Sequence, residues 1–283
     1  MKLLSLFAAA ALLLCAASLG SAPPEGRDQA GEGLYDFGGA SGGALTLYRQ
    51  GWIEILRFGR WTEAERLYRE AVAADPDFLL AQSVLARITA DSAERDRLYA
   101  VVHSRNDAVD EQGQLLLHTY QRTLELFARR EAGCTASADD RRAMARRAVA
   151  DYRRFLDSSP REWSVIIEYM EWVHALEGAE AALRVVEDLR GAVDTPLYFS
   201  YFPAWFEAEL GNHEKAAAMA DDFAARLKDP DAPQPHYLRA FLAQQRGELE
   251  VARQQIEKAL RLDPRHLLAS RLRAEILDSL AEG

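Results

Sequence analysis

The chain is poor in cysteine, in lysine and in long apolar runs. Cys15 and Cys134 are the only cysteines among 283 residues, so a disulfide framework or a zinc site of paired cysteines is excluded. No HExxH motif, glycine-rich phosphate loop or nucleophile elbow is present. The formal net charge is −10, with little lysine, which argues against nucleic acid or anionic lipid as the main partner because both require a basic surface.

Residues 1–22 have the pattern of a secretory signal peptide. Lys2 supplies the positive charge, an apolar run follows over residues 3–14, and small residues suited to cleavage occupy 16–22. The apolar run is shorter than the roughly 20 residues of a transmembrane helix. Together with an alanine- and arginine-rich, bacterial-looking composition, this predicts export to the periplasm. Cys15 leaves a lipoprotein open as an alternative, and membrane association is expected only if Cys15 is lipidated.

Residues 23–43 are rich in glycine and proline and have no periodic apolar pattern, which predicts a flexible tether. The island Leu34-Tyr35-Asp36-Phe37 carries an alternative, namely docking on the folded domain. The ordered domain is predicted to span residues 44–283. Its apolar residues recur at helical spacing and no strand pattern is present, so an all-α fold is expected.

Two stretches of this domain share one pattern of turn, packing and stop residues. In residues 233–264 the turn is at Gly247, Asp263-Pro264 ends the unit, and small residues stand where two helices would approach closely, at Ala240, Ala243, Ala252 and Ala259. In residues 45–76 the corresponding turn, packing and stop residues are Gly59, Ala64, Tyr68, Ala71 and Asp75-Pro76. Glycine suits the turn and proline suits the end because neither favours continuation of a helix.

These two hairpins resemble tetratricopeptide repeats (TPRs), which have a period of about 34 residues. The resemblance extends less regularly over residues 44–280, with an insertion between residues 91 and 140 expected in loops near 104–110 and 131–138. It implies a TPR-like right-handed α-solenoid of about six helical hairpins plus a C-terminal capping helix at residues 267–280. A polar outer face on that helix would keep the array soluble.

The resemblance also implies that the first helix of each hairpin lines a concave groove that binds a protein or peptide. The groove positions carried onto this chain are Arg49, Ile53, Tyr198, Tyr201, Trp205, Tyr237, Phe241 and Gln244. Aromatic side chains dominate binding hot spots, which favours a site here. The alternative is that these aromatics pack between hairpins as core. Pro203 leaves open whether Tyr198 and Tyr201 lie on the helix or in a loop before it.

We therefore expect an exported TPR-type adaptor without catalytic activity, cofactor or metal. The alternative is a structural or lipid-anchored subunit of a cell-envelope complex. A metalloenzyme is a third hypothesis, because Glu168, Glu171 and His174 share one helical stripe; a solvated stripe is the simpler interpretation. Six arginines between residues 141 and 154 suggest either an acidic partner or a salt-bridged solvent face. The partner and the oligomeric state do not follow from the sequence.

Overall fold

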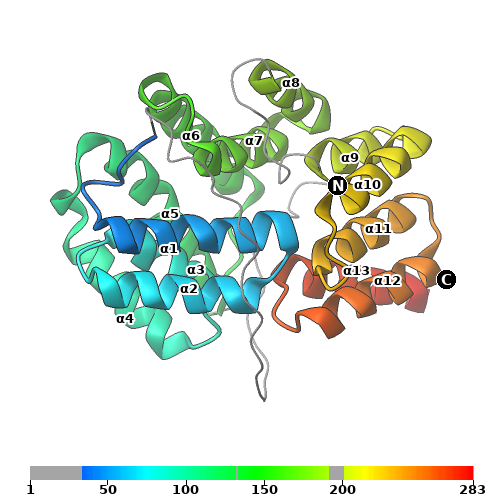
Figure 1. Ribbon diagram of the computed structural model, residues 1–283, viewed down its shortest axis with the longest axis horizontal. Coiled ribbons are helices and arrows are strands. Elements are labelled where there is room, and N and C mark those ends of the chain that lie inside the picture. Colours follow the sequence, from blue (N-terminus) through cyan, green and yellow to red (C-terminus); the bar gives the residue numbers. More distant parts are fainter. Residues whose placement is uncertain (1–33, 132, 191–200, 283) are drawn as a thin grey trace.

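In this computed structural model, which describes residues 34–131, 133–190 and 201–282, all regular secondary structure is helical (Figure 1). The helices are α1 (Gly42–Ile53), the π-helical turn η1 (Glu54–Phe58), α2 (Trp61–Ala74), α3 (Leu79–Ile88), α4 (Ser92–Ser104), the 3-10 turn η2 (Asn106–Ala108), α5 (Glu111–Glu131), α6 (Ala138–Ser158), α7 (Trp163–Glu177), α8 (Ala179–Arg190), α9 (Tyr201–Glu209), α10 (His213–Leu227), α11 (Pro233–Gln245), α12 (Leu249–Leu262) and α13 (Leu267–Glu282). The prediction of an all-α fold is confirmed.

Consecutive helices pack in pairs: α1 with α2, α3 with α4, and so on to α11 with α12, and α13 packs on α12. The loops between α4 and α5 and between α5 and α6 coincide with the predicted insertions. None of the described helices is long and apolar enough to cross a bilayer.

The first and last hairpins are built from the residues that their shared pattern singled out. Gly59 and Gly247 both adopt a φ of 75°, a left-handed conformation that costs glycine little. The small packing positions of both hairpins are buried, which lets the paired helices approach closely: Ala64, Ala71, Ala240, Ala243, Ala252 and Ala259. Asp75 and Asp263 end α2 and α12 before their prolines.

Residues 34–41, the described segment before α1, are packed on the helices. Its aromatic residues are therefore docked, as the alternative interpretation expected, and are not part of a flexible tether. Tyr35 packs its ring edge-on against Phe155 of α6, with 5.1 Å between centroids, and Phe37 lies 5.0 Å from Tyr48 of α1. Both docked rings are buried. Burial of such a side chain contributes about 1.5–3 kcal/mol, which explains why a glycine-rich segment is held here. The predicted signal peptide and residues 23–33 lie outside the described residues.

A buried carboxylate ties the middle hairpins together. Glu168 of α7 accepts hydrogen bonds from Arg87 of α3 (2.8 Å), Tyr120 of α5 (2.6 Å) and Tyr152 of α6 (3.3 Å). Glu168 and the two tyrosines are buried, and the Arg87 guanidinium is nearly so. A buried charge is tolerated when it is paired and hydrogen-bonded, and removing one partner of such a pair costs about 3–5 kcal/mol. This side chain is therefore structural.

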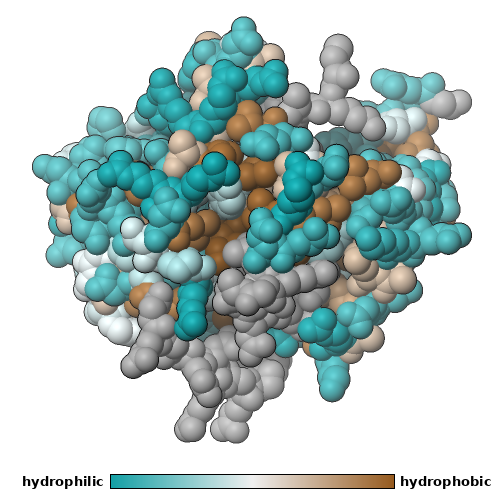
Figure 2. Space-filling view, turned by 90° about the horizontal axis from the view of Figure 1, so that it is seen from above, coloured by the Kyte–Doolittle hydropathy of each residue, from teal (hydrophilic) through white to brown (hydrophobic). Residues whose placement is uncertain are grey.

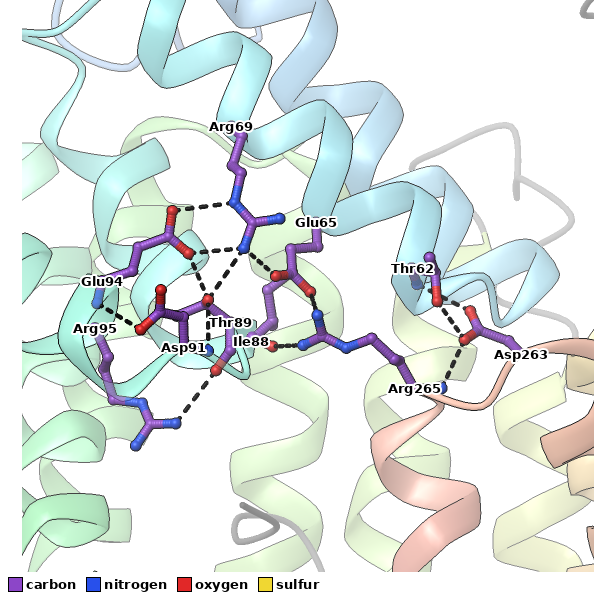
Figure 3. Close-up of polar contacts among 10 residues, drawn as sticks. All are labelled: Thr62, Glu65, Arg69, Ile88, Thr89, Asp91, Glu94, Arg95, Asp263 and Arg265. Carbon is purple, nitrogen blue, oxygen red and sulfur yellow. Dashed lines mark hydrogen bonds and ion pairs between the residues drawn. The ribbon is translucent and has the colours of Figure 1, made fainter. Parts of the chain in front are cut away.

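The two ends of the array meet. Thr62, in the first turn of α2, donates its backbone N–H (2.9 Å) and its hydroxyl (2.7 Å) to the carboxylate of Asp263 at the end of α12 (Figure 3). Arg60 pairs with Asp229, just before α11, at 2.6 Å. In Figure 1 the start of α2 accordingly lies against the orange and red C-terminal helices. We call these contacts the closure.

Arg265, in the loop before α13, extends the closure toward the second hairpin. Its guanidinium forms an ion pair with Glu65 of α2 and donates to the carbonyl oxygen of Ile88 at 2.9 Å (Figure 3). Glu65 is buried and also pairs with Arg69, which in turn contacts Glu94 of α4 at 2.7 Å. The last loop is thereby bonded to both of the first two hairpins.

Gly59 lies at the tightest point of the closure. A Cβ atom added there would sit 2.9 Å from the backbone nitrogen of Gln234 and 3.0 Å from His266 Nε2. The first of these distances is shorter than Cβ contacts in relaxed structures, and the atom it meets is backbone, so glycine allows α11 to approach η1 this closely. Gly59 thus serves both the left-handed turn of its own hairpin and the contact with the last one.

Candidate functional site

Aromatic side chains from α7, α9 and α11, the first helices of three successive hairpins, converge in one place. The Trp205 ring lies 5.3 Å from Phe241 and 6.4 Å from Tyr237, edge to face in both cases, and 5.8 Å from His174. Edge-to-face pairs are favourable beyond their buried area. We call His174, Tyr201, Trp205, Tyr237 and Phe241 the aromatic cluster.

The helical spacing arranges this cluster in two layers. Trp205 follows Tyr201 by four residues on α9, and Phe241 follows Tyr237 by four on α11, so each pair lies on one face of its helix. Pro203 falls in the first turn of α9, where its missing N–H removes no helical hydrogen bond. Tyr201 is therefore on the helix. Tyr198 lies outside the described residues.

The cluster packs densely. Tyr201, Trp205, Tyr237 and Phe241 are between 2% and 8% exposed, so the description of these residues as core between hairpins holds for the structure as it stands. In the space-filling view from above, hydrophobic residues form a band across the middle of the face, flanked by hydrophilic surface, on the side where Figure 1 shows α6 to α9 (Figure 2). Such a band bordered by polar residues is typical of an interaction site.

Two nitrogen atoms of the cluster are buried without a hydrogen-bond partner among the residues that the structure describes. They are Nε1 of Trp205 and Nδ1 of His174. The other ring nitrogen of His174, Nε2, is hydrogen-bonded to Glu209 at 2.6 Å. Buried polar atoms are nearly always paired, and an unpaired one costs about 1–3 kcal/mol. The Trp205 N–H therefore lacks the hydrogen-bond acceptor that a buried donor normally has.

Glu171, one turn before His174 on α7, adds a carboxyl group to this region. It forms no hydrogen bond or ion pair with the residues that the structure describes, and its side chain keeps intermediate exposure. Burial, and after it the charge of Glu168, raises the pKa of Glu171 to about 8. The pKa values of Tyr201 and Tyr237 are also raised, in both cases chiefly by burial and secondly by the charge of Glu171. Glu171 thus lies in electrostatic reach of both tyrosines.

Comparison with known proteins adds no identity. No protein-family model matches the chain, and no curated protein matches it significantly.

The other predicted groove residues lie apart from the cluster or at its margin. Arg49 donates to the carbonyl oxygen of Tyr35 (2.8 Å) and pairs with Glu162 (3.3 Å), the N-cap of α7 about two and a half turns before Glu171. Ile53 is a half-buried residue that ends α1. Gln244 is half-buried on α11, three residues after Phe241. Of the predicted aromatic groove residues, Trp205, Tyr237 and Phe241 are thus in ring contact, and Arg49 lies apart from them.

Two of the three residues of the metal hypothesis are bonded to other side chains. Glu168 is committed to Arg87 and His174 to Glu209, while Glu171 has neither as a partner. Among the described residues no group of three or more His, Cys, Asp or Glu side chains is placed to hold a metal ion. Of the arginine cluster, Arg153 donates to the Tyr169 hydroxyl at 3.0 Å and Arg154 pairs with Glu111, in keeping with a bonded solvent face.

Sequence reasoning missed the connection between the stripe on α7 and the aromatics on α9 and α11. Glu171 and His174 were singled out as metal ligands, and the aromatics separately as groove positions. The hairpin period relates only the two tyrosines: Tyr201 and Tyr237 stand at matching distances before the turn glycines Gly211 and Gly247, whereas Glu171 stands closer to Gly178. The nearness of Glu171 to the aromatics therefore depends on helix packing, for which the sequence carries no signal.

Proposed function

We propose that this protein is an exported, periplasmic adaptor with a TPR-like right-handed α-solenoid fold that binds an extended segment or helix of a partner protein through the aromatic cluster. The succession of helical hairpins with shared turn and packing residues supports the solenoid. The signal-peptide pattern of residues 1–22 supports export. Rigid aromatic side chains give large contact area at little entropic cost, which supports polypeptide binding.

The observation that carries the proposal is the state of Trp205. Its ring is held by Tyr237, Phe241 and His174, yet its indole N–H has no acceptor within the described part of the chain. A main-chain carbonyl oxygen of a bound polypeptide is the acceptor that such a donor suits, and buried tryptophan N–H groups usually have one. Binding would then recover the free energy that the unpaired N–H costs the free protein.

Selection from a phage-displayed library of random peptides tests this. The purified protein would be panned beside a Trp205→Ala/Phe241→Ala variant and beside Phe155→Leu, which shortens a buried aromatic of α6 outside the cluster. Circular dichroism and thermal unfolding would establish that all three are folded. We expect peptides that bind the unaltered protein and Phe155→Leu but lose at least about tenfold in affinity for the double variant.

Trp205→Phe separates the indole N–H from the ring, because it keeps most of the aromatic surface and removes the donor. A loss of affinity with this variant would assign the N–H its acceptor in the peptide. Enrichment of the same peptides by all variants would contradict binding at the cluster. If no peptide is enriched and the protein self-associates on size-exclusion chromatography, the structural or lipid-anchored subunit becomes the better description.

A further inference from the structure

The aromatic cluster is acidic at its edge. Glu171 is on α7 and Glu209 on α9. Burial raises the pKa of Tyr237 most, the charge of Glu171 adds to this, and the charge of Glu275 on α13 adds a smaller effect. Glu209 is bonded to His174 and Glu275 to Arg271 (3.3 Å), so both have local partners. Glu171 alone of these three has none in the part of the chain that the structure describes, and it lies one turn before His174, whose ring is 5.8 Å from that of Trp205. The region therefore offers one uncompensated carboxyl beside aromatic rings.

We propose that the cluster recognises a lysine or arginine side chain of the bound polypeptide, with Glu171 as its counter-ion and the aromatic rings beside it; this rests on the proposed function. Two features of the site match that chemistry. Aromatic faces attract cations through the ring quadrupole, and more strongly when water is excluded. A carboxylate without a partner in a poorly hydrated site is stabilised chiefly by an opposite charge. Trp205, which is 4% exposed with an unpaired N–H, then takes a carbonyl of the same segment.

The groups that face Glu171 explain why it remains unpaired. On its own helix Glu168 repels its charge, and on α3 the guanidinium of Arg87 attracts it. Arg87 is already bonded to Glu168 at 2.8 Å, however. The neighbours on α9 and α11 are the phenols of Tyr201 and Tyr237, which carry no positive charge. No cation among the described side chains is thus left to neutralise Glu171, and a ligand can supply one.

This arrangement couples binding to the release of a proton. With a pKa of about 8, the Glu171 carboxyl is mostly protonated at pH 7 in the free protein. A bound ammonium or guanidinium favours the carboxylate and returns the pKa toward its ordinary value, so binding at pH 7 releases a proton from Glu171 to the buffer. A neutral ligand leaves the carboxyl protonated and releases none.

The experiment uses a peptide enriched in the panning described above. We expect the enriched peptides to share one basic position. Isothermal titration calorimetry would compare such a lysine peptide with the same peptide acetylated at that lysine, in two buffers of different ionisation enthalpy. Acetylation removes the charge and keeps the aliphatic stem. The lysine form should bind about tenfold more tightly and release a proton.

Glu171→Gln should abolish both the preference for lysine and the proton release. Its control is Glu180→Gln on α8, an exposed glutamate paired with Arg184, which should change neither. Three results would overturn this inference: equal affinity for the two peptides, binding without proton release, or a Glu171→Gln variant that keeps the lysine preference and the proton release of the unaltered protein. If the enriched peptides then still require Trp205 and Phe241, the adaptor function stands without it. If no peptide is enriched at all, both proposals fail together.

Discussion

Thr62 and Asp263 are 201 residues apart in the chain and joined by two hydrogen bonds, one from the Thr62 backbone and one from its hydroxyl. The same carboxylate accepts the backbone N–H of Arg265 at 2.8 Å. Asp263 therefore orders the loop that leads into α13 and, at the same time, satisfies an N–H in the first turn of α2, which has no acceptor within its own helix. One side chain links the last hairpin to the first.

Thr62→Val tests this link, because valine keeps the shape and removes the hydroxyl. We expect the free energy of unfolding to fall by about 1–2 kcal/mol, since Asp263 is buried and would lose a donor. Thr46→Val is the control: its hydroxyl donates to the Gly42 carbonyl oxygen on the exposed face of α1 and should matter less. Urea denaturation followed by circular dichroism measures both. Equal losses would show that the closure bond contributes nothing beyond a local one.

Gly59→Ala should destabilise the protein more than Gly247→Ala. Both glycines have a φ of 75°, so alanine pays about 1–2 kcal/mol for the left-handed conformation at either position. A Cβ at Gly247 meets nothing within 4 Å, whereas at Gly59 it meets the backbone of Gln234. The difference in unfolding free energy, expected to be about 1–3 kcal/mol, isolates the approach of α11. Equal losses of unfolding free energy in the two variants would mean that α11 can move away from Gly59 at no cost.

The ion pair of Glu65 with Arg265 should show measurable coupling in a double-mutant cycle. We expect about 1–2 kcal/mol of coupling between Glu65→Ala and Arg265→Ala, because the Glu65 side chain is 3% exposed. The exposed pair Glu63 and Arg66, within α2, provides the comparison and should couple by about 0.5 kcal/mol or less. Coupling of the same small size for both pairs would contradict a role for Arg265 in holding the ends together.

Acid should weaken the closure through His266. This buried ring accepts the Ala269 N–H at Nδ1 (3.1 Å), so its proton is on Nε2, which donates to Gln234 at 3.2 Å. Burial lowers the pKa of His266 to about 3. A histidine with a depressed folded-state pKa contributes stability above its unfolded pKa of about 6.5, and this is lost as pH falls toward 3.

We therefore expect the free energy of unfolding to fall below about pH 6.5, by up to about 1.4 kcal/mol per pH unit from this residue. His266→Asn retains a side chain able to cap α13 and should remove that part of the slope. The exposed His118, changed to asparagine, serves as the control. Urea denaturation at a series of pH values gives the result. An unchanged slope in His266→Asn would place the acid sensitivity elsewhere.

The helices and turns could be predicted because their signals are local. Gly59 and Gly247 were expected at turns and both have positive φ. The capping helix predicted at residues 267–280 begins at the same residue as α13 and ends two residues before it. Glycine, Asp-Pro and apolar spacing act within a few residues, so one sequence is enough to read them.

The closure could not be predicted, because its residues look ordinary in sequence. Glu65 and Arg265 are charged residues of types found on any helical surface, and no spacing rule relates positions in the first and last hairpins. For Tyr35 and Phe37 docking could be proposed as an alternative, but their glycine-rich surroundings resemble a tether and the sequence does not indicate which helices receive them. Of the candidate site, the aromatics followed from repeat positions, whereas the unpaired state of Glu171 depends on Arg87 being bonded elsewhere.

An open array of helical hairpins can be lengthened or shortened by whole repeats, because each unit needs only its neighbours. This protein cannot be edited in that way. A duplicated or deleted hairpin between α3 and α10 would carry Arg265 and Asp263 away from Glu65 and Thr62, and buried Glu65 and Asp263 would lose these partners. The closure therefore sets how many hairpins the chain contains, and an engineer who wishes to alter it must change loops and not repeats.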